Sequence, residues 1–147
     1  MYSLNNIDLK QFLSQYWQKK PLVIKQGFEN FIDPLDEHDL AGLSQEPSVD
    51  SRIVSQTDNV WQVNHGPFDD VNAYCSGSWS LLVQSVDHFI PEADQLMRAF
   101  DFIPHWRIDD LMVSFSNREA GVGSHLDQYD VFIIQGKGSR RWQVGLP

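Results

Sequence analysis

The stretch from Leu111 to Val144 constrains the fold more than any other part of the sequence, because it holds several β-prone runs separated by turn residues. Residues 111–116 alternate in side-chain character, residues 131–134 are a β-branched and aromatic run, and residues 140–144 follow a Gly-Lys-Gly turn. On a strand, side chains two positions apart point to the same face of the sheet. The stretch therefore predicts neighbouring strands of a mainly β domain.

His125 and Asp127 are the residues of this stretch that look chemical rather than structural. On a strand both side chains would point to one face, so an imidazole and a carboxylate would converge on one point. Such a pair supplies two of the three ligands of a facial 2-His-1-carboxylate iron site, which leaves three coordination positions open. The alternative is an incidental surface or hydrogen-bonding pair, because His-x-Asp is a short and common pattern.

Arg140 is expected to point inward, on the strand face that it shares with Trp142 and Val144. A buried guanidinium requires an anionic partner, and its planar fork suits a carboxylate that is bound through both oxygens. An ordinary salt bridge, or a side chain that reaches the rim, is the alternative. Together, the metal pair and an inward arginine on a neighbouring strand suggest iron with an acidic cosubstrate.

The run SFSNREAGVGSHLDQYDVFIIQGKGSRRWQVG resembles the metal-binding strand region of the Jumonji-C-type, cupin-like 2-oxoglutarate oxygenases. Within that superfamily, the run is most similar to the bacterial ribosomal-protein arginine hydroxylases. The motifs WRIDDLMVSFS, WSLLVQ, WQVNHGPF, FIDP and WQKKPLVIK extend the resemblance over essentially the whole chain.

The resemblance implies a mainly β fold with flanking helices, an α+β double-stranded β-helix of the cupin or jelly-roll type that is incomplete in this chain. Residues 1–147 would form the N-terminal part of the Jumonji-C domain. Its helical and strand N-terminal region would cover residues 1–108 and its first barrel strands residues 109–147. Later barrel strands and domains, including those for dimerisation, would lie outside these residues.

The resemblance also implies a ligand set. His125 and Asp127 would bind Fe(II), Arg140 would bind the far carboxylate of 2-oxoglutarate, and O₂ would be the oxidant. The family's third ligand is a later histidine, and no histidine follows His125 among these 147 residues. We therefore expect the 147-residue chain to be inactive by itself. Further candidates are Ser114 and Ser116 for the cosubstrate and Gln128 and Tyr129 for the substrate.

The activity that the resemblance implies for the parent protein is hydroxylation of an arginine side chain on an L16-like, basic ribosomal protein, by a homodimer. Two alternatives remain open. One is a related oxygenase that acts on another protein residue or on a small molecule. The other is a cupin-like binding module without turnover.

Charge and cysteine content limit the possible partners. The formal net charge of −9 disfavours direct nucleic-acid binding, which needs a basic surface, and favours a basic protein partner. Cys75 is the only cysteine, which suits a reducing compartment. The apolar runs reach about four residues, whereas a membrane-spanning helix needs about 20. These features predict a cytoplasmic protein without a membrane segment.

The remainder of the chain is expected to alternate short helices and strands. Asp8 is a good N-cap for an amphipathic helix, Pro91 suits the first turn of another, and Asp58-Asn59 suits a hairpin turn. The expected helices cover residues 9–17, 33–43 and 91–100, and the expected strands cover 22–24, 51–54, 60–63, 79–83 and 111–116.

Overall fold

A computed structural model describes residues 2–145, which divide into two compact units. Unit 1 combines Met1–Asp33 with His125–Pro147, and unit 2 is the continuous segment Pro34–Ser124. All four strands of the described chain lie in unit 2. Among residues 2–145 there is no helix with the length and apolar character needed to cross a membrane.

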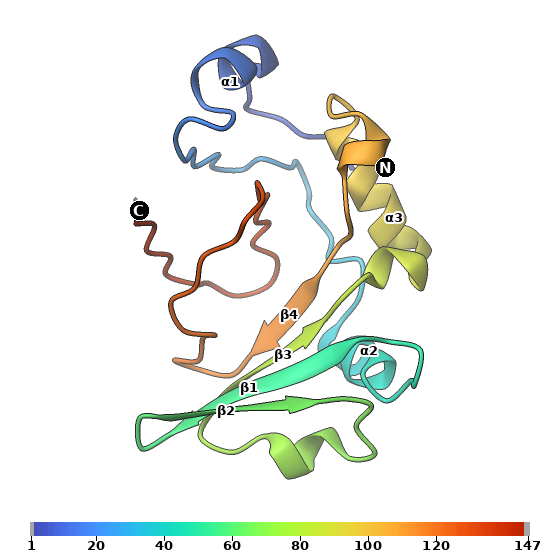
Figure 1. Cartoon of the computed structure of the whole chain (residues 1–147). Coiled ribbons are helices and arrows are strands. Elements are labelled where there is room, and N and C mark those ends of the chain that lie inside the picture. Colours follow the sequence, from blue (N-terminus) through green and yellow to red (C-terminus); the bar gives the residue numbers. More distant parts are fainter. Residues whose placement is uncertain (1, 146–147) are drawn as a thin grey trace. The chain divides into compact units, whose positions relative to one another are not determined.

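The sheet of unit 2 is antiparallel, with the strand order β2-β1-β3-β4 (Figure 1). Its strands are β1 (Ser51–Thr57), β2 (Val60–His65), β3 (Ser78–Val83) and β4 (Val113–Ser116). The predicted hairpin is confirmed, since β1 pairs with β2 around Asp58 and Asn59. These two residues adopt φ values of 51° and 62°, the left-handed conformation that a two-residue hairpin turn requires.

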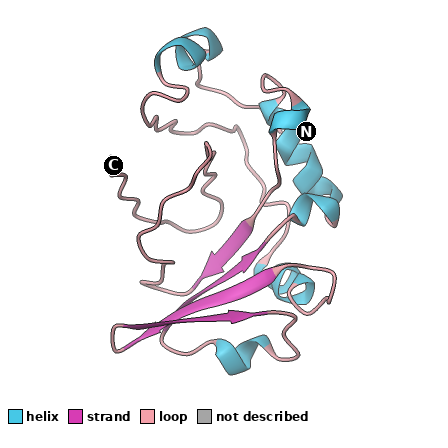
Figure 2. Cartoon of the chain, in the orientation of Figure 1, coloured by secondary structure: helices cyan, strands magenta, loops and turns pink. Residues whose placement is uncertain are grey.

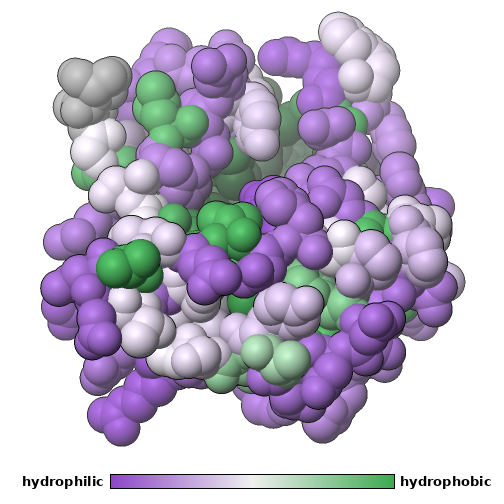
Figure 3. Space-filling model, turned by 60° about the horizontal axis from the view of Figure 1, so that its bottom comes forward, coloured by the Kyte–Doolittle hydropathy of each residue, from purple (hydrophilic) through white to green (hydrophobic). Residues whose placement is uncertain are grey.

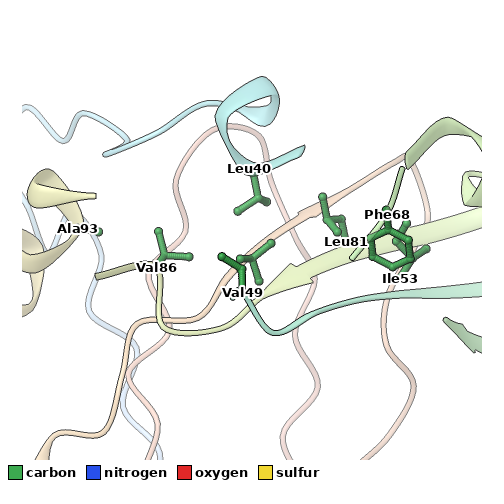
Figure 4. Close-up of a cluster of buried hydrophobic side chains, with 8 residues drawn as sticks. Leu40, Val49, Ile53, Phe68, Leu81, Val86 and Ala93 are labelled. Atoms are coloured by element: carbon green, nitrogen blue, oxygen red, sulfur yellow. The ribbon is translucent and has the colours of Figure 1, made fainter. Parts of the chain in front are cut away.

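The hydrophobic core covers one face of this sheet. Ile53 of β1 lies opposite Leu81 of β3, and both are almost fully buried. Helix α2 (Glu37–Leu43) places Leu40 over the same face, as Figure 4 shows. The core is therefore built from Ile53 of β1 and the alternate apolar positions of β3, together with residues of α2 and α3 and of the connecting segments. Its buried members are Leu40, Val49, Ile53, Phe68, Leu81, Val83, Val86 and Ala93.

The helices begin at residues with the expected capping chemistry. In α1 (Leu9–Gln15) the Asp8 carboxylate accepts a hydrogen bond of 3.0 Å from the Gln11 amide, which confirms the predicted N-cap. Pro91 opens α3 (Pro91–Met97), also as predicted. Helix α2 begins later than expected, because Asp36 and not Asp33 caps it. Short 3-10 helices cover Val71–Tyr74, Val86–His88, Arg98–Phe100 and His105–Arg107.

Two carboxylates fix the chain where it enters β4. Asp110 accepts hydrogen bonds from the Ser85 amide at 2.7 Å and from the Ser85 hydroxyl at 3.1 Å. Asp87 accepts a hydrogen bond of 2.8 Å from the Leu111 amide. These acidic side chains therefore have a structural role, because they bind the β3-to-α3 connection to the segment that precedes β4.

The predicted class, an antiparallel sheet with flanking helices, is confirmed, but three expected strands are wrong. Residues 22–24, the run 131–134 and the segment 140–144 are irregular, and so is the segment that carries His125 and Asp127 (Figure 2). A strand is stabilised by hydrogen bonds to a neighbouring strand. Among residues 2–145, the four strands of the sheet pair only with one another.

Several large apolar side chains remain at the surface because the segments that carry them are not paired in the sheet. Figure 3 shows such apolar side chains in green among hydrophilic side chains in purple. Trp142 is 48% exposed and Val144 69% exposed, so the strand face on which Arg140 was expected to point inward is not buried. The other exposed apolar residues after Ser124 are Leu126, Tyr129, Val131 and Ile133.

Candidate metal and cosubstrate site

His125 and Asp127 lie close together although they are not on a strand. His125 Nε2 is 3.8 Å from Asp127 Oδ1, and the two side chains are 52% and 43% exposed. Two ligands in adjacent positions of one metal ion, with bonds of about 2.1 Å, lie roughly 3 Å apart. A small rotation of either side chain would therefore bring both donor atoms to one ion.

The pair offers an imidazole nitrogen and a carboxylate oxygen, a donor set that suits Fe(II). Among residues 2–145, no three side chains of His, Cys, Asp or Glu gather in a way that could hold an ion. The residues therefore fit the metal as two of the three ligands of a facial site.

Arg140 is half-buried in unit 1. Its guanidinium carbon lies 5.8 Å from the centre of the Trp142 ring, within the range of a cation–π contact. The two side chains thus contact each other, as their shared face predicted, although the segment is irregular. Gly138 has a φ of 89°, which confirms the turn expected before Arg140.

Ser114 and Ser116 lie on β4, in unit 2. Ser116 is opposite Ser80 and Ser114 is opposite Leu82, so both serines point away from the core face. The hydroxyls of Ser80 and Ser116 are 2.7 Å apart, and the Ser80 hydroxyl is also 3.2 Å from the Gly121 carbonyl oxygen, to which it can donate. The expected alternation of β4 is confirmed, and the hydroxyl of Ser116 is engaged within unit 2.

Gln128 and Tyr129 line a cavity of about 710 Å³ in unit 1. The exposed fraction of Tyr129 is 70%, so its ring is open to solvent. Residues 127–131 form one side of this cavity, and residues 16–22 contribute the other. The sequence interpretation assigned residues 16–22 no role in a site. The sequence feature found there is a helix that ends beside a proline, and this feature does not indicate a binding site.

Cys75 is a poor candidate for a nucleophile. Burial raises the pKa of its thiol, and the nearby Asp70 carboxylate raises it further. The thiol also lies 3.2 Å from the Val71 carbonyl oxygen. Because the thiolate is the reactive form of cysteine, these surroundings make Cys75 less reactive than an exposed cysteine.

Residues 95–147 match the JmjC domain family. The resemblance to the Jumonji-C oxygenases is confirmed. The match includes β4, the His125–Asp127 pair and Arg140, so every candidate residue lies within the part of the chain that the family covers.

Curated relatives extend the similarity over most of the chain. The chain is 58% identical over 134 residues to the "Ribosomal protein uL16 3-hydroxylase" of Escherichia coli (strain K12), which covers 91% of this chain and 36% of that protein. It is 43% identical over 136 residues to the "Probable ribosomal oxygenase" of Haemophilus influenzae, covering 91% of this chain and 34% of that protein. The chain thus spans about a third of the length of these relatives.

A solved structure of a ribosomal oxygenase is similar to this chain as well. It is described as YcfD, a ribosomal oxygenase from Escherichia coli, in complex with cobalt and 2-oxoglutarate. The TM-score is 0.84 at 52% sequence identity, over 88% of this chain and 36% of that one. A structure of the same oxygenase with cobalt and succinic acid matches with the same TM-score of 0.84.

Proposed function

We propose that this chain is part of an Fe(II)- and 2-oxoglutarate-dependent dioxygenase that hydroxylates an arginine side chain of an L16-like ribosomal protein. The proposal rests on the convergence of His125 and Asp127, at 3.8 Å, in a chain 58% identical to a uL16 3-hydroxylase. Residues 1–108 would form the N-terminal region of the Jumonji-C domain, and residues 109–147 would supply its first barrel segments.

In this scheme His125 and Asp127 hold the metal, and Arg140 binds the far carboxylate of 2-oxoglutarate through the fork of its guanidinium. Bound iron would supply the coupling of 2-oxoglutarate decarboxylation to oxidation of a C–H bond by O₂. The half-buried position of Arg140 supports its role, since partial burial strengthens a charge-assisted contact. Ser114 and Ser116 are proposed as cosubstrate contacts.

Gln128 and Tyr129 are proposed as substrate contacts because they line the cavity next to Asp127. An aromatic ring and an amide oxygen suit a guanidinium, which stacks on rings and donates hydrogen bonds. The net charge of −9 favours a basic protein substrate over a nucleic acid. A ribosomal substrate and the single cysteine among these 147 residues support a cytoplasmic location, and by its family resemblance we propose a homodimer.

The test uses the full-length natural protein and its His125→Ala and Asp127→Ala variants. Iron binding is measured under anaerobic conditions, and succinate formation is measured with a ribosomal-protein substrate. Both variants should lose iron affinity by at least about tenfold, since each removes a ligand. His88→Ala is the matched control, because His88 Nε2 lies 3.6 Å from Asp87 Oδ2 in unit 2.

Unchanged iron affinity in His125→Ala would overturn the proposal. Binding of iron and 2-oxoglutarate without succinate formation would instead favour the cupin-like binding module. Succinate formation that depends on a substrate other than a ribosomal protein would favour the related oxygenase.

A further inference from the structure

We infer that the N-terminal segment positions the two halves of the site through two separate contacts. Trp17 and Gln18, just after α1, position the half that carries His125 and Asp127. Asp33 positions the half that carries Arg140. This inference rests on the proposed function, because it assigns positioning residues to that site.

The first contact, called the α1 contact, joins Trp17 and Gln18 to the segment after Asp127. Gln18 Nε2 donates a hydrogen bond of 2.9 Å to Asp130 Oδ2. The Trp17 ring stacks on the Phe132 ring, with ring centres 5.6 Å apart and an interplanar angle of 15°. Phe12 of α1, which is 7% exposed, packs against both rings. A polar contact and an apolar cluster therefore hold residues 130–132.

The second contact, called the Asp33 contact, lies at the turn that precedes Arg140. The Lys137 amide donates a hydrogen bond of 3.1 Å to Asp33 Oδ2. A Cβ atom at Gly136 would lie 1.8 Å from Asp33 Oδ1, so the carboxylate occupies the space that a side chain at Gly136 would need. The backbone of this turn and the carboxylate therefore fit closely, and a side chain at Gly136 would displace the Asp33 carboxylate.

These contacts matter because residues 117–145 contain no strand among the described residues. In a sheet, hydrogen bonds along the strands would fix the direction of each ligand. Here the α1 contact lies three residues after Asp127, and the Asp33 contact lies three residues before Arg140. Each contact therefore acts mainly on the nearer half of the site, so the two effects are separable.

For the Asp33 contact, the variants are Asp33→Ala, Asp33→Asn and Gly136→Ala in the full-length protein. Asp33→Ala and Gly136→Ala should raise the Kd of 2-oxoglutarate roughly tenfold, the scale for partners that orient a ligand indirectly. Asp33→Asn keeps a carbonyl oxygen that accepts from the Lys137 amide, so it should stay near the wild-type value. Iron affinity should change little in all three.

For the α1 contact, Gln18→Ala should lower iron affinity roughly tenfold and leave the Kd of 2-oxoglutarate, measured at saturating metal, close to wild type. Trp17→Phe keeps an aromatic ring against Phe132 and should have a smaller effect than Trp17→Ala. Gln62→Ala is the matched control, since Gln62 is an exposed glutamine on β2 of unit 2.

The two dissociation constants are measured by calorimetry, with Fe(II) titrated anaerobically, and thermal melting shows that each variant is folded. The inference is supported if Asp33→Ala weakens mainly 2-oxoglutarate binding and Gln18→Ala weakens mainly Fe(II) binding. The inference is overturned if Asp33→Ala and Gln18→Ala each change the Kd of Fe(II) and the Kd of 2-oxoglutarate equally, or if neither variant changes either Kd. The proposed function stands in both cases. A wild-type protein that binds neither Fe(II) nor 2-oxoglutarate overturns the proposed function as well.

Discussion

The sheet of unit 2 and the segment 125–145 of unit 1 both contain apolar, β-prone runs, but these runs form buried strands only in unit 2. Ile53 and Leu81 lie in β-prone runs and are 0% and 2% exposed. Val131 and Ile133 lie in a run of the same kind and are 51% and 56% exposed. The difference teaches that an apolar β-prone run becomes a buried strand only where neighbouring strands pair with it.

The same comparison separates stability from chemistry. Unit 2 holds most of the buried apolar residues, whereas the candidate metal ligands His125 and Asp127, and Arg140, lie in unit 1. Substitutions in the core should therefore change the free energy of unfolding, and substitutions in the segment should change binding.

The largest expected effect is on the core. Leu81→Ala should lower the free energy of unfolding by about 2–5 kcal/mol, because it removes a buried side chain and leaves a cavity. Ile133→Ala removes a side chain that is 56% exposed and should change stability by less than about 1 kcal/mol. Chemical denaturation of the two variants measures both values. Equal losses would remove the distinction between the two regions.

Arg140→Lys should weaken 2-oxoglutarate binding by about 1–3 kcal/mol, which is roughly a fivefold to 150-fold change in Kd. Lysine keeps the positive charge but loses the two-point fork. Arg141→Lys is the control, because Arg141 is the exposed neighbour of Arg140. Calorimetric titration with 2-oxoglutarate compares them, and similar Kd values for Arg140→Lys and wild type would contradict the role of Arg140.

A smaller loss of stability is expected where the chain enters β4. Asp110→Ala leaves the Ser85 amide and hydroxyl without their acceptor and should cost about 1–2 kcal/mol. Asp109→Ala, at the exposed neighbouring position, should cost less than about 0.5 kcal/mol. Urea denaturation distinguishes the two variants. If both cost the same, the Asp110 hydrogen bonds do not stabilise unit 2.

The association rate with a basic ribosomal protein should fall as the salt concentration rises. The net charge of −9 attracts such a partner, and salt screens this attraction. A severalfold decrease in the association rate constant between about 0.05 and 0.3 M salt is expected. Stopped-flow measurements at two ionic strengths test this. A rate that does not change with salt would mean that the acidic charge does not steer the partner.

The smallest expected effect concerns Cys75. Its raised pKa means that less thiolate is present near pH 8 than in an exposed cysteine, and that its alkylation rate keeps rising at higher pH. Alkylation of the native protein is compared with that of the urea-unfolded chain, and Cys75 is the only cysteine of these 147 residues. A native rate that levels off at lower pH than the unfolded rate would contradict the raised pKa.

Local signals allowed much of unit 2 to be predicted. Asp58-Asn59 has the residues of a hairpin turn, and within a helix Pro91 fits best in the first turn, so both features were found without tertiary information. The closeness of His125 and Asp127 was also predicted, although from a strand that does not form.

The Asp33 contact could not be predicted, because it joins residues 104 positions apart. Asp33 was expected at the start of a helix over residues 33–43, but α2 begins at Glu37 with Asp36 as its N-cap. Contacts of a polar side chain with a distant backbone amide have no sequence periodicity. The residues that support the candidate site are therefore harder to predict than its ligands.

Unit 2 is continuous in sequence and unit 1 is not, and this difference affects the order in which the two units fold during synthesis. The hairpin of β1 and β2 closes over two residues, whereas the contact of Gln18 with Asp130 closes a loop of 112 positions, at an entropic cost roughly 3 kcal/mol higher. During synthesis at about 5–20 residues per second, the roughly 90 residues between Asp33 and His125 take about 5–20 s to emerge. Pro34–Ser124 is then complete and free to fold. Residues 2–33 acquire their contacts with residues 125–145 only afterwards, when the segment that carries the candidate metal ligands has emerged.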